Sequence, residues 1–317
     1  MAQNLEEFIA YRSTLGYTGN NIRSLLRPFD RYAKDKTANW DLFQPLFFLG
    51  FREHLKGDPR WVNAILCAVR GFFQFLVRKG SVKENPMQHV PPLAERAFIP
   101  FVFSPEQTQR LLNAVQKRLR KSEKNFLKDL GIYMVLMLMA RCGLRISEPL
   151  RLLYANYRPK EGTIYIEKTK FNKDRLIPLP KRAVAEIVNY LATRNTWIHG
   201  DKNPFLFAGH ANKTMSDTQV YSVFHQAVND IGLNQPRRVI ADTTFGAPRP
   251  HSLRHSFAIN TLKNIKQRGK SLQDALPVLA TYMGHTKYRY TAVYLKVIDA
   301  EQRHGLVDFS ISRQEEI

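Results

Sequence analysis

Two short segments combine an arginine with a side chain that can hold or transfer a proton. Arg145 lies three residues before Glu148, and His251 lies three residues before Arg254. Side chains with this spacing share one face of a helix. Taken singly, the first pair is no more than a surface ion contact, and the second suggests an anion site at the start of a helix. Together, such groups supply the positive charge and proton transfer that chemistry on a phosphate requires.

Further groups of the same chemical kind lie between and after these pairs. The alternating residues 163–167 and 175–179 predict two strands joined by a basic turn that carries Lys170. His285 follows Gly284 at the predicted end of a helix, where a histidine is commonly only a capping contact. Nearby are four tyrosines, each a possible nucleophile: Tyr282, Tyr288, Tyr290 and Tyr294.

The charge of the chain indicates a polyanionic partner. It has 48 lysines and arginines against 27 acidic residues, a formal net charge of +21. Positive clusters recur at residues 117–121 and 168–175 and at Arg237 and Arg238. Each basic side chain placed on a phosphate releases condensed counterions, so nucleic acid is the commonest partner of such a protein. Charge alone does not separate DNA from RNA.

The length of 317 residues suits two domains, each with its own apolar interior. Apolar residues recur at helical spacing from Leu5 to about Gly80, with helices expected near residues 42–55 and 61–78. Four prolines between residues 86 and 100 mark an extended linker. The sequence therefore predicts a helical domain at residues 1–90, a linker at 91–103 and a larger domain at 104–317.

The larger domain is predicted to be mainly helical around the hairpin. It opens at Ser104, which forms a capping-box pattern with Gln107 around a proline in the first turn. Further helices are expected at about residues 182–193, 217–231, 252–266 and 276–283. The predicted fold class is therefore mainly α with a small β-hairpin or sheet, that is, α+β.

Cofactors, metals and membranes are not indicated. Cys67 and Cys142 lack the spacing of metal ligands, and the chain has no glycine-rich phosphate loop or carboxylate cluster for two magnesium ions. No apolar run approaches the roughly 18 residues of a membrane span, and the N-terminus lacks a secretory signal. We therefore expect a cytoplasmic, nucleoid-associated protein that uses neither metal nor cofactor.

The order Arg, Lys, His-x-x-Arg, Gly-His and Tyr resembles that of the tyrosine recombinase, or phage integrase, family. The matching segments are Cys142–Glu148, Thr169–Leu179, His251–Ala258, and Met283–Thr286 with Thr291–Tyr294. A chance match of all of them in order is much rarer than a chance match of one. The first domain, with its Phe72-Phe73 helix and its Asn85-Pro86 ending, looks like the family's helical core-binding domain. The resemblance therefore spans nearly the whole chain.

The resemblance implies a role for each matched residue. It implies that Arg145 and Arg254 hold the scissile phosphate and that Lys170 and His251 handle protons. It further implies that His285 supports the phosphate and that Tyr294 attacks it. Glu148 is expected to orient Arg145 or His251. Guanidinium groups match the charge and shape of a phosphate, and a tyrosine with a reference pKa near 10 needs a nearby base.

Several assignments stay open at this point. Tyr290 is the second choice for the nucleophile, Lys173 competes weakly with Lys170, and His255 is interpreted as structural. DNA contacts outside the reacting centre are expected from four basic residues: Lys173, Arg175, Arg237 and Arg238.

The resemblance also implies how the protein would act on DNA. We expect a two-domain, C-shaped clamp on double-stranded DNA with specific recombination sites, a homo-tetramer on DNA, which can include a related recombinase, and exchange through a Holliday junction. The residues after Tyr294 are expected to contact a neighbouring subunit. Integration or excision of a mobile element is favoured over Xer-type resolution of dimers. Type IB topoisomerase activity and non-catalytic regulation through DNA binding stay open as well.

Overall fold

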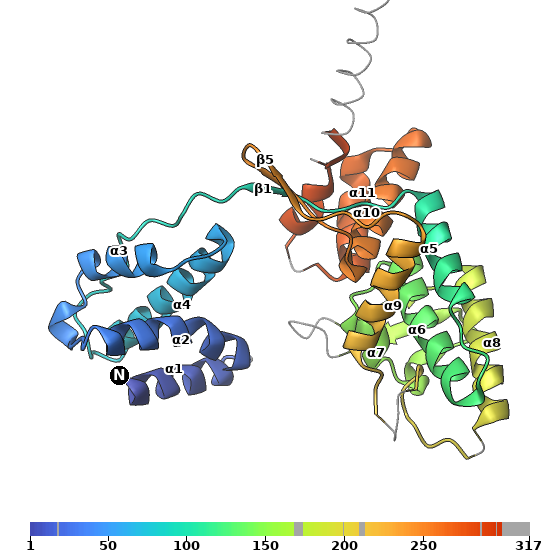
Figure 1. Ribbon diagram of the computed structural model, residues 1–317, viewed down its shortest axis with the longest axis horizontal. Helices are drawn as coiled ribbons and strands as arrows, with labels where there is room; N and C mark the ends of the chain where they lie inside the picture. Colours follow the sequence, from blue (N-terminus) through green and yellow to red (C-terminus); the bar gives the residue numbers. More distant parts are fainter. Residues whose placement is uncertain are drawn as a thin grey trace, which may run out of the picture. The chain divides into compact units, whose positions relative to one another are not determined.

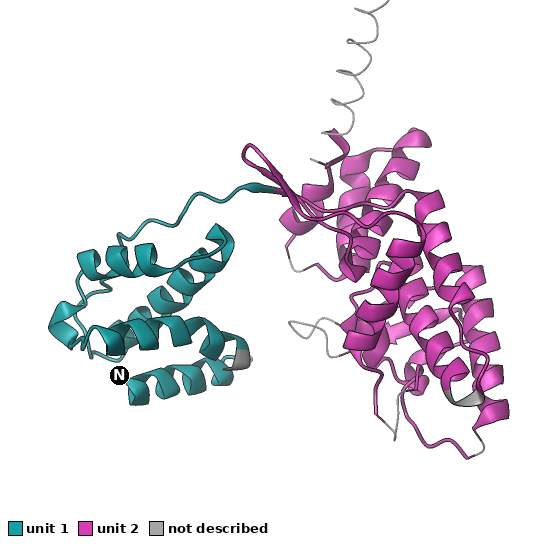
Figure 2. Ribbon diagram, in the orientation of Figure 1, with its two compact units in different colours: residues 1–97 teal, residues 98–317 magenta. Residues whose placement is uncertain are grey.

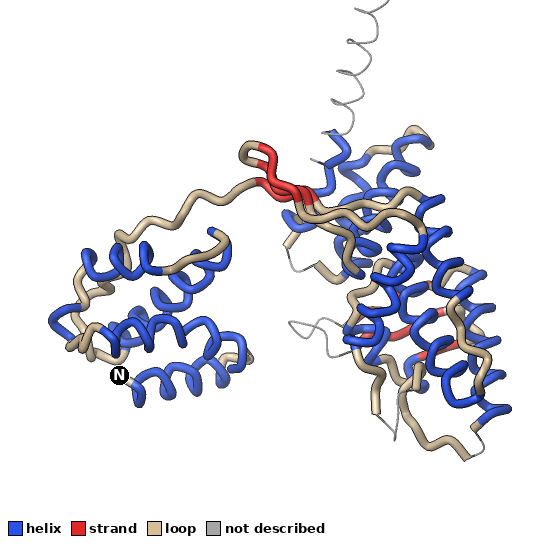
Figure 3. The backbone as a smooth tube through the Cα atoms, in the orientation of Figure 1, coloured by secondary structure: helices blue, strands red, loops and turns tan. Residues whose placement is uncertain are grey.

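The computed structural model describes residues 1–17, 19–167, 174–198, 200–208, 213–285, 287–295 and 297–299. The chain divides into two compact units, Met1–Ala97 and Phe98–Ile317 (Figure 2). The division falls within the segment 91–103 that the sequence predicts to be a linker. The elements of both units are mostly helices, with a few short strands (Figure 3).

Unit 1 is built from four helices, α1 (Ala2–Thr14), α2 (Gly19–Asp35), α3 (Pro45–His54) and α4 (Pro59–Arg78), with a short 3-10 turn between α2 and α3 (Figure 1). Its core is rich in aromatic rings. Phe29 of α2 is fully buried and packs against phenylalanines of α3 and α4, including Phe48 and Phe73. The helical interpretation of this part of the sequence is therefore confirmed.

Helix α4 has the length and composition of a membrane span, a property that the sequence patterns did not indicate. No other helix among the described residues has both properties. Eight of its residues are buried in the core of unit 1, so α4 packs as the central helix of a folded domain. Its N-terminus is capped by Asp58, whose carboxylate accepts the backbone N–H of Arg60.

Unit 2 surrounds a long apolar helix, α6 (Glu123–Cys142). This helix packs against α5 (Pro105–Lys117), α8 (Lys181–Trp197), α9 (Asp217–Asp230) and α10 (Pro250–Gln267). The short α7 (Ser147–Arg151) follows α6, and α11 (Leu272–Met283) packs on α10. The capping box predicted at Ser104 and Gln107 is present at the start of α5. Because α6 is covered by several helices, residues 132–140 are all buried.

The predicted hairpin is confirmed. Strands β3 (Thr163–Ile166) and β4 (Arg175–Pro178) pair antiparallel, and β2 (Tyr157–Arg158) adds to the other edge of β3. The register places Ile164 opposite Ile177, and both side chains are buried in the core of unit 2. The turn between β3 and β4 holds Lys170 and Lys173, and both lie outside the described residues.

A second small sheet was not predicted. Its strand order is β1 (Ala97–Ile99), β6 (Thr243–Phe245) and β5 (Arg238–Ile240). The backbone N–H of Gly246 donates to the carbonyl of Ile99 at 2.9 Å. All three strands are only three residues long, which is too short for an alternating pattern to identify them in the sequence, and β1 and β5 are mostly exposed. The long segment before His251 is therefore partly a hairpin.

Candidate active site

Three arginines from different elements converge on the C-terminal end of α11. The side chains of Arg175, Arg254 and Arg145 donate, in that order, to the three successive carbonyl oxygens of Tyr282–Gly284, at 2.9, 2.5 and 3.0 Å. These are carbonyls that a helix end leaves without backbone partners, and they carry its negative partial charge. The end of α11 therefore holds three cations that would otherwise repel one another.

Glycine is required where α11 ends. Gly284 has φ +65°, the left-handed region that glycine adopts without strain. A Cβ atom at this position would lie 2.8 Å from Nη1 of Arg175, which is too close for a non-bonded contact. Gly284 of the Gly-His pair therefore both ends the helix and leaves room for the guanidinium of Arg175.

Glu148 is the carboxylate at the centre of this cluster. Its Oε1 accepts from Nη1 of Arg145 at 3.1 Å and from Nη1 of Arg175 at 3.0 Å. Its Oε2 accepts the backbone N–H of Arg145 at 2.8 Å and Nη2 of Arg175 at 2.9 Å. Burial alone would raise the pKa of Glu148, but the hydrogen bonds and charge of Arg175 lower the pKa below its ordinary value. Glu148 is therefore ionised and orients Arg145, one of the two residues that the sequence suggested.

Arg254 is buried without a carboxylate of its own. Its side chain donates to the carbonyls of Gly143 and Met283 at 2.6 and 2.5 Å, and the residue is 1% exposed. In the described part of the chain, no aspartate or glutamate forms an ion pair with it. Burial, followed by the charge of Arg145, lowers the pKa of Arg254 to about 9. The site is therefore prepared for an anion from outside the chain.

Tyr294 points into this charged region. It lies in the helical segment 289–295, is 4% exposed and packs in an apolar cluster with residues of α10 and α11. Burial raises the pKa of its hydroxyl, and the charges of Arg254 and Arg145 act in the opposite direction. Without an added base, Tyr294 is therefore protonated at neutral pH.

His255 is the histidine that contacts the Tyr294 hydroxyl, with an Nδ1–oxygen distance of 3.1 Å. The sequence suggested a structural role for His255 and assigned the proton of the tyrosine to His251. Burial, followed by the charges of His251 and Arg254, lowers the pKa of His255 to about 3, so its ring is neutral and can accept a proton. The available signal was the spacing of four between His251 and His255, which places both on one face of α10.

His251 is the more exposed of the two histidines, His251 and His255, that share one face of α10. Its ring meets that of His255 edge to face, with centroids 4.7 Å apart, and the residue is exposed to solvent. Packing of the ring against its neighbours and the charges of Arg254 and Arg145 lower the pKa of His251. His251 is therefore accessible to a substrate, whereas His255 is the partner of the buried tyrosine.

His285 is fixed beside Tyr294 by a different contact. Its Nδ1 and the hydroxyl of Thr291 form a hydrogen bond of 2.8 Å, and its ring centroid lies 6.3 Å from that of Tyr294. Burial, then the charge of Arg254, lowers the pKa of His285 to about 3. Thr291 is fully buried. The structure therefore brings the Gly-His motif and the tyrosine segment together.

Tyr290, the second choice for the nucleophile, is placed differently. It is 47% exposed, and its ring lies 6.4 Å from the ring of His285. Tyr282 is also separate from the reacting groups, because its hydroxyl donates to the carbonyl of Pro178 at 3.3 Å. The hydroxyl of Tyr294, by contrast, contacts a buried histidine, His255.

The expected DNA contacts divide into three cases. Arg175 is a correction: its side chain is 8% exposed and is held by Glu148 and the end of α11, so it does not form part of the outer surface. Arg237 and Arg238 are exposed at strand β5. Lys173 lies outside the described residues.

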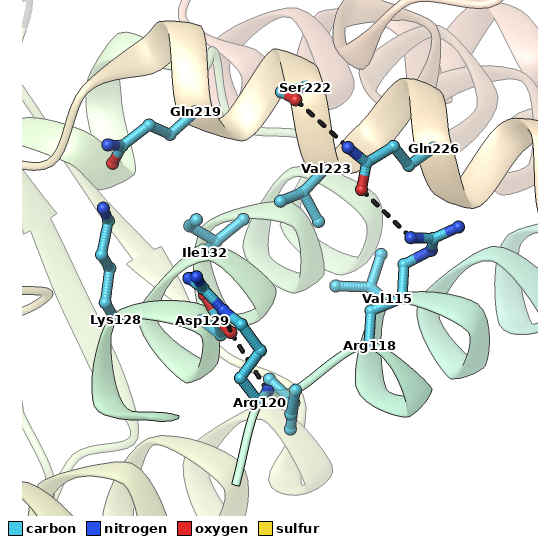
Figure 4. Close-up of a pocket in the computed structure, with 11 residues that line it drawn as sticks. Val115, Arg118, Arg120, Lys128, Asp129, Ile132, Gln219, Ser222, Val223 and Gln226 are labelled. Carbon is cyan, nitrogen blue, oxygen red and sulfur yellow. Dashed lines mark hydrogen bonds and ion pairs between the residues drawn. The ribbon is translucent and has the colours of Figure 1, made fainter. Parts of the chain in front are cut away.

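A separate cleft of about 520 Å³ lies between α5, α6 and α9 (Figure 4). Two of its three basic side chains form ion pairs: Arg118 pairs with Asp230 at 2.5 Å, and Arg120 pairs with Asp129 at 2.7 Å. None of the residues described above as the candidate site lines it. Nor do three metal-ligating side chains cluster anywhere in the described ranges. The arginine and histidine cluster is thus the best candidate for chemistry.

Comparisons with known proteins show which sequences and folds the chain resembles. The phage integrase family matches residues 102–301. The putative integrase/recombinase y4rE of Sinorhizobium fredii is 27% identical over 295 residues, which are 93% of this chain and 91% of the relative.

Two solved structures share the fold. XerH site-specific recombinase, in a post-cleavage complex with its palindromic difH substrate, matches with a TM-score of 0.69 and 16% identity over 91% of this chain and 78% of that chain. A lambda integrase tetramer bound to a Holliday junction matches with a TM-score of 0.65 and 15% identity over 92% and 76%. These likenesses confirm the predicted fold class, mainly helical with small sheets.

Proposed function

Because the chain belongs to the phage integrase family of tyrosine recombinases, it is a site-specific DNA recombinase, and we propose that Tyr294 is the residue through which it cuts and rejoins DNA. One observation supports this most directly. The hydroxyl of Tyr294 contacts a neutral histidine and lies within the electrostatic field of Arg145 and Arg254. A nucleophile, a base and a binding site for a phosphate are therefore adjacent.

The first step of the proposed reaction moves one proton and one phosphoryl bond. Tyr294 transfers its hydroxyl proton to Nδ1 of His255 as its oxygen attacks the phosphorus. The bond from phosphorus to the 5′-oxygen breaks, and that oxygen takes a proton from Lys170, which lies outside the described residues. Arg145 and Arg254 stabilise the charge that gathers on the non-bridging oxygens. The product is a 3′-phosphotyrosyl bond.

Resealing is the reverse of this step with a new strand. A 5′-hydroxyl attacks the phosphotyrosyl phosphorus and gives its proton to Lys170, while the bond from phosphorus to the tyrosine oxygen breaks and Tyr294 regains its proton from His255. The phosphotyrosyl ester keeps the energy of the broken DNA bond, so the exchange requires no ATP. Neither step uses a metal ion, and His251, exposed next to His255, can exchange the proton with solvent.

Binding of DNA would itself prepare the histidines. The pKa values of His255 and His285 are lowered by burial and, among other charges, by Arg254. A bound phosphate offsets the arginine charge, which raises both pKa values toward neutrality. His255 then becomes a stronger proton acceptor at the moment when a substrate is present.

Double-stranded DNA with specific recombination sites is the proposed partner. The net charge of +21 supports binding to DNA, and both solved structures named above hold DNA. We propose a clamp of the two units around the duplex and a tetramer on two sites, since lambda integrase forms a tetramer on a Holliday junction. The expected subunit contact after Tyr294 falls mainly on residues 300–317, outside the described part of the chain.

The biological role is proposed to be integration or excision of a mobile element. Its support is the likeness to a putative integrase/recombinase. The likeness to XerH supports Xer-type resolution as a second candidate. The two roles differ in the DNA that is recombined: the ends of an element, or two copies of a resolution site.

The decisive experiment uses nicked suicide duplexes made from the DNA that flanks the gene, without metal or ATP. Wild-type protein should form a protein–DNA adduct that survives denaturation. Tyr294→Phe should form none, whereas Tyr290→Phe, which removes a neighbouring exposed hydroxyl, should form the adduct normally. An adduct that persists in Tyr294→Phe would assign the nucleophile elsewhere, and wild-type protein that binds tightly without an adduct would favour a DNA-binding regulator.

A further inference from the structure

Arg175 uses its guanidinium entirely inside the protein. It stands at the first position of β4, and its Nε donates to the carbonyl of Tyr282 at 2.9 Å. Its two terminal nitrogens form a bidentate pair with Glu148 at 3.0 and 2.9 Å. With all three nitrogens engaged and the side chain 8% exposed, Arg175 is poorly placed to bind a DNA phosphate.

The carboxylate that pairs with Arg175 also binds a second arginine, Arg145. Each oxygen of Glu148 accepts one hydrogen bond from Arg175 and one from Arg145. Glu148 is therefore fixed from one side and orients Arg145 from the other. Arg145 is 31% exposed, so it is the member of this chain of contacts that can reach a phosphate.

The third contact of Arg175 reaches another part of the site. The carbonyl of Tyr282 belongs to the last turn of α11, directly before Gly284 and His285. The missing Cβ of Gly284 provides the space in which the guanidinium lies. Arg175 therefore connects β4, the strand that leaves the lysine-bearing turn, to the turn that carries His285.

We propose that Arg175 is a positioning residue of the recombinase site. Through Glu148 it fixes the guanidinium of Arg145, and through the end of α11 it fixes the turn of His285. The proposal rests on the proposed function, because it concerns the same phosphate-binding site. The competing explanation is a buried ion pair that contributes only to the stability of the fold.

Substitution by lysine separates these two roles, since lysine keeps the charge but cannot direct three hydrogen bonds along fixed axes. Arg194→Lys is the matched control. Arg194 is also buried, pairs with Asp201 at 2.6 Å and donates to three backbone carbonyls, but it contacts none of the site residues. If Arg175 contributes only to stability, Arg175→Lys and Arg194→Lys should both lower Tm and have the same effect on the reaction rate.

The measurement is the single-turnover rate of covalent adduct formation on a suicide duplex, with DNA affinity and Tm of the same preparations. Arg175→Lys should slow adduct formation by about 10²-fold, because a small misplacement of a phosphate-binding group has an effect of this order. Its DNA affinity should stay within about threefold, since binding energy is spread over many phosphate contacts. Arg194→Lys should lower Tm at least as much and form the adduct at the wild-type rate.

Equal rates for Arg175→Lys and wild type would overturn the proposal, as would an equal slowing in Arg194→Lys. Should Arg175→Lys fail to fold, Glu148→Gln offers a second test, because it keeps the size of the carboxylate and weakens both arginine contacts. It should slow adduct formation with little change in affinity, and a wild-type rate would contradict the proposal. An adduct from wild-type protein is the internal standard: its absence would count against the proposed function and not against Arg175 alone.

Discussion

Two buried arginines of unit 2 are held in opposite ways. Arg194 of α8 is 4% exposed, pairs with Asp201 and donates to three carbonyls, so its charge is neutralised within the fold. Arg254 of α10 is 1% exposed, and within the described ranges its side chain donates to two carbonyls, those of Gly143 and Met283, and to no carboxylate. Glu148 lies close enough to offset part of its charge, but it pairs with Arg145 and Arg175.

This difference separates an arginine whose charge is matched within the fold from one that has no paired carboxylate among the described residues. When a buried charge pairs with an opposite charge, the partner within the fold offsets the cost of removing the charge from water. A buried charge without one is costly, and the cost is recovered when an anion binds. The lowered pKa of Arg254, to about 9, has the same origin, namely burial first and then the charge of Arg145. The site is thus destabilising by itself and complementary to a phosphate.

The largest expected effects on reaction rate and stability come from two single substitutions, in which either Arg254 or Arg194 is replaced by methionine. Arg254→Met should slow adduct formation by at least about 10²- to 10³-fold, because one group that stabilises the developing charge is lost. Its Tm should not fall, since an unmatched buried charge is removed. Arg194→Met should leave Asp201 unpaired and reduce the free energy of unfolding by about 3 kcal/mol, with a normal rate in the folded fraction. Suicide-substrate kinetics and thermal unfolding of both variants measure this, and a common loss of Tm would remove the distinction.

The neutral partner of Tyr294 gives the next effect. His255→Gln retains a polar side chain but no base, so adduct formation should slow by about 10²-fold. His225→Gln, on the exposed surface of α9, is the control and should react normally. If His255→Gln reacts at the wild-type rate while His251→Gln does not, the proton of the tyrosine passes to His251 instead.

A smaller effect concerns stability against acid. The pKa values of His255 and His285 are lowered to about 3 in the folded protein, from an ordinary value of 6.5. The unfolded chain therefore binds protons that the folded chain does not as the pH falls from about 6.5 toward 3. The contribution of the neutral histidines to the free energy of unfolding is therefore complete above pH 6.5. It decreases below this pH by up to ~1.4 kcal/mol per pH unit for each histidine.

Thermal unfolding between pH 7.5 and pH 5 measures this loss. His255→Phe should show a shallower decrease of Tm with acid than wild type, because one of the three histidines with a lowered pKa, His251, His255 and His285, is gone. A short duplex with the recombination site should also reduce the decrease, since its phosphate raises both pKa values. Identical slopes for wild type and His255→Phe would show that His255 is not held neutral by the fold.

The smallest effect is expected at the surface. Arg238 is exposed on β5, where its charge is screened by salt. Arg238→Ala should weaken DNA binding slightly and reduce the slope of log affinity against log salt by about 1 if it contacts a phosphate. The rate of adduct formation at saturating DNA should not change, in contrast to Arg254→Met. An unchanged salt slope would exclude a phosphate contact at this position.

The sequence by itself determined the features that depend on local order. The capping box at Ser104, the hairpin on either side of Lys170 and the helices of both units follow from short-range patterns. The set of reactive residue types, with Arg145, Arg254 and Tyr294 among them, was also readable, because their order along the chain is specific to a family.

Only the tertiary structure decided which of these side chains meet. The partner of Tyr294 is His255, although His251 has the same chemistry and lies one turn away on the same face of α10. Arg175 belongs to a basic stretch that resembles a DNA contact, yet its side chain turns inward to Glu148. Both outcomes depend on contacts between segments far apart in the chain, where the end of α11 meets β4 and α10. Local patterns record residue types and spacing, but the direction and burial of a side chain are fixed by the elements packed around it.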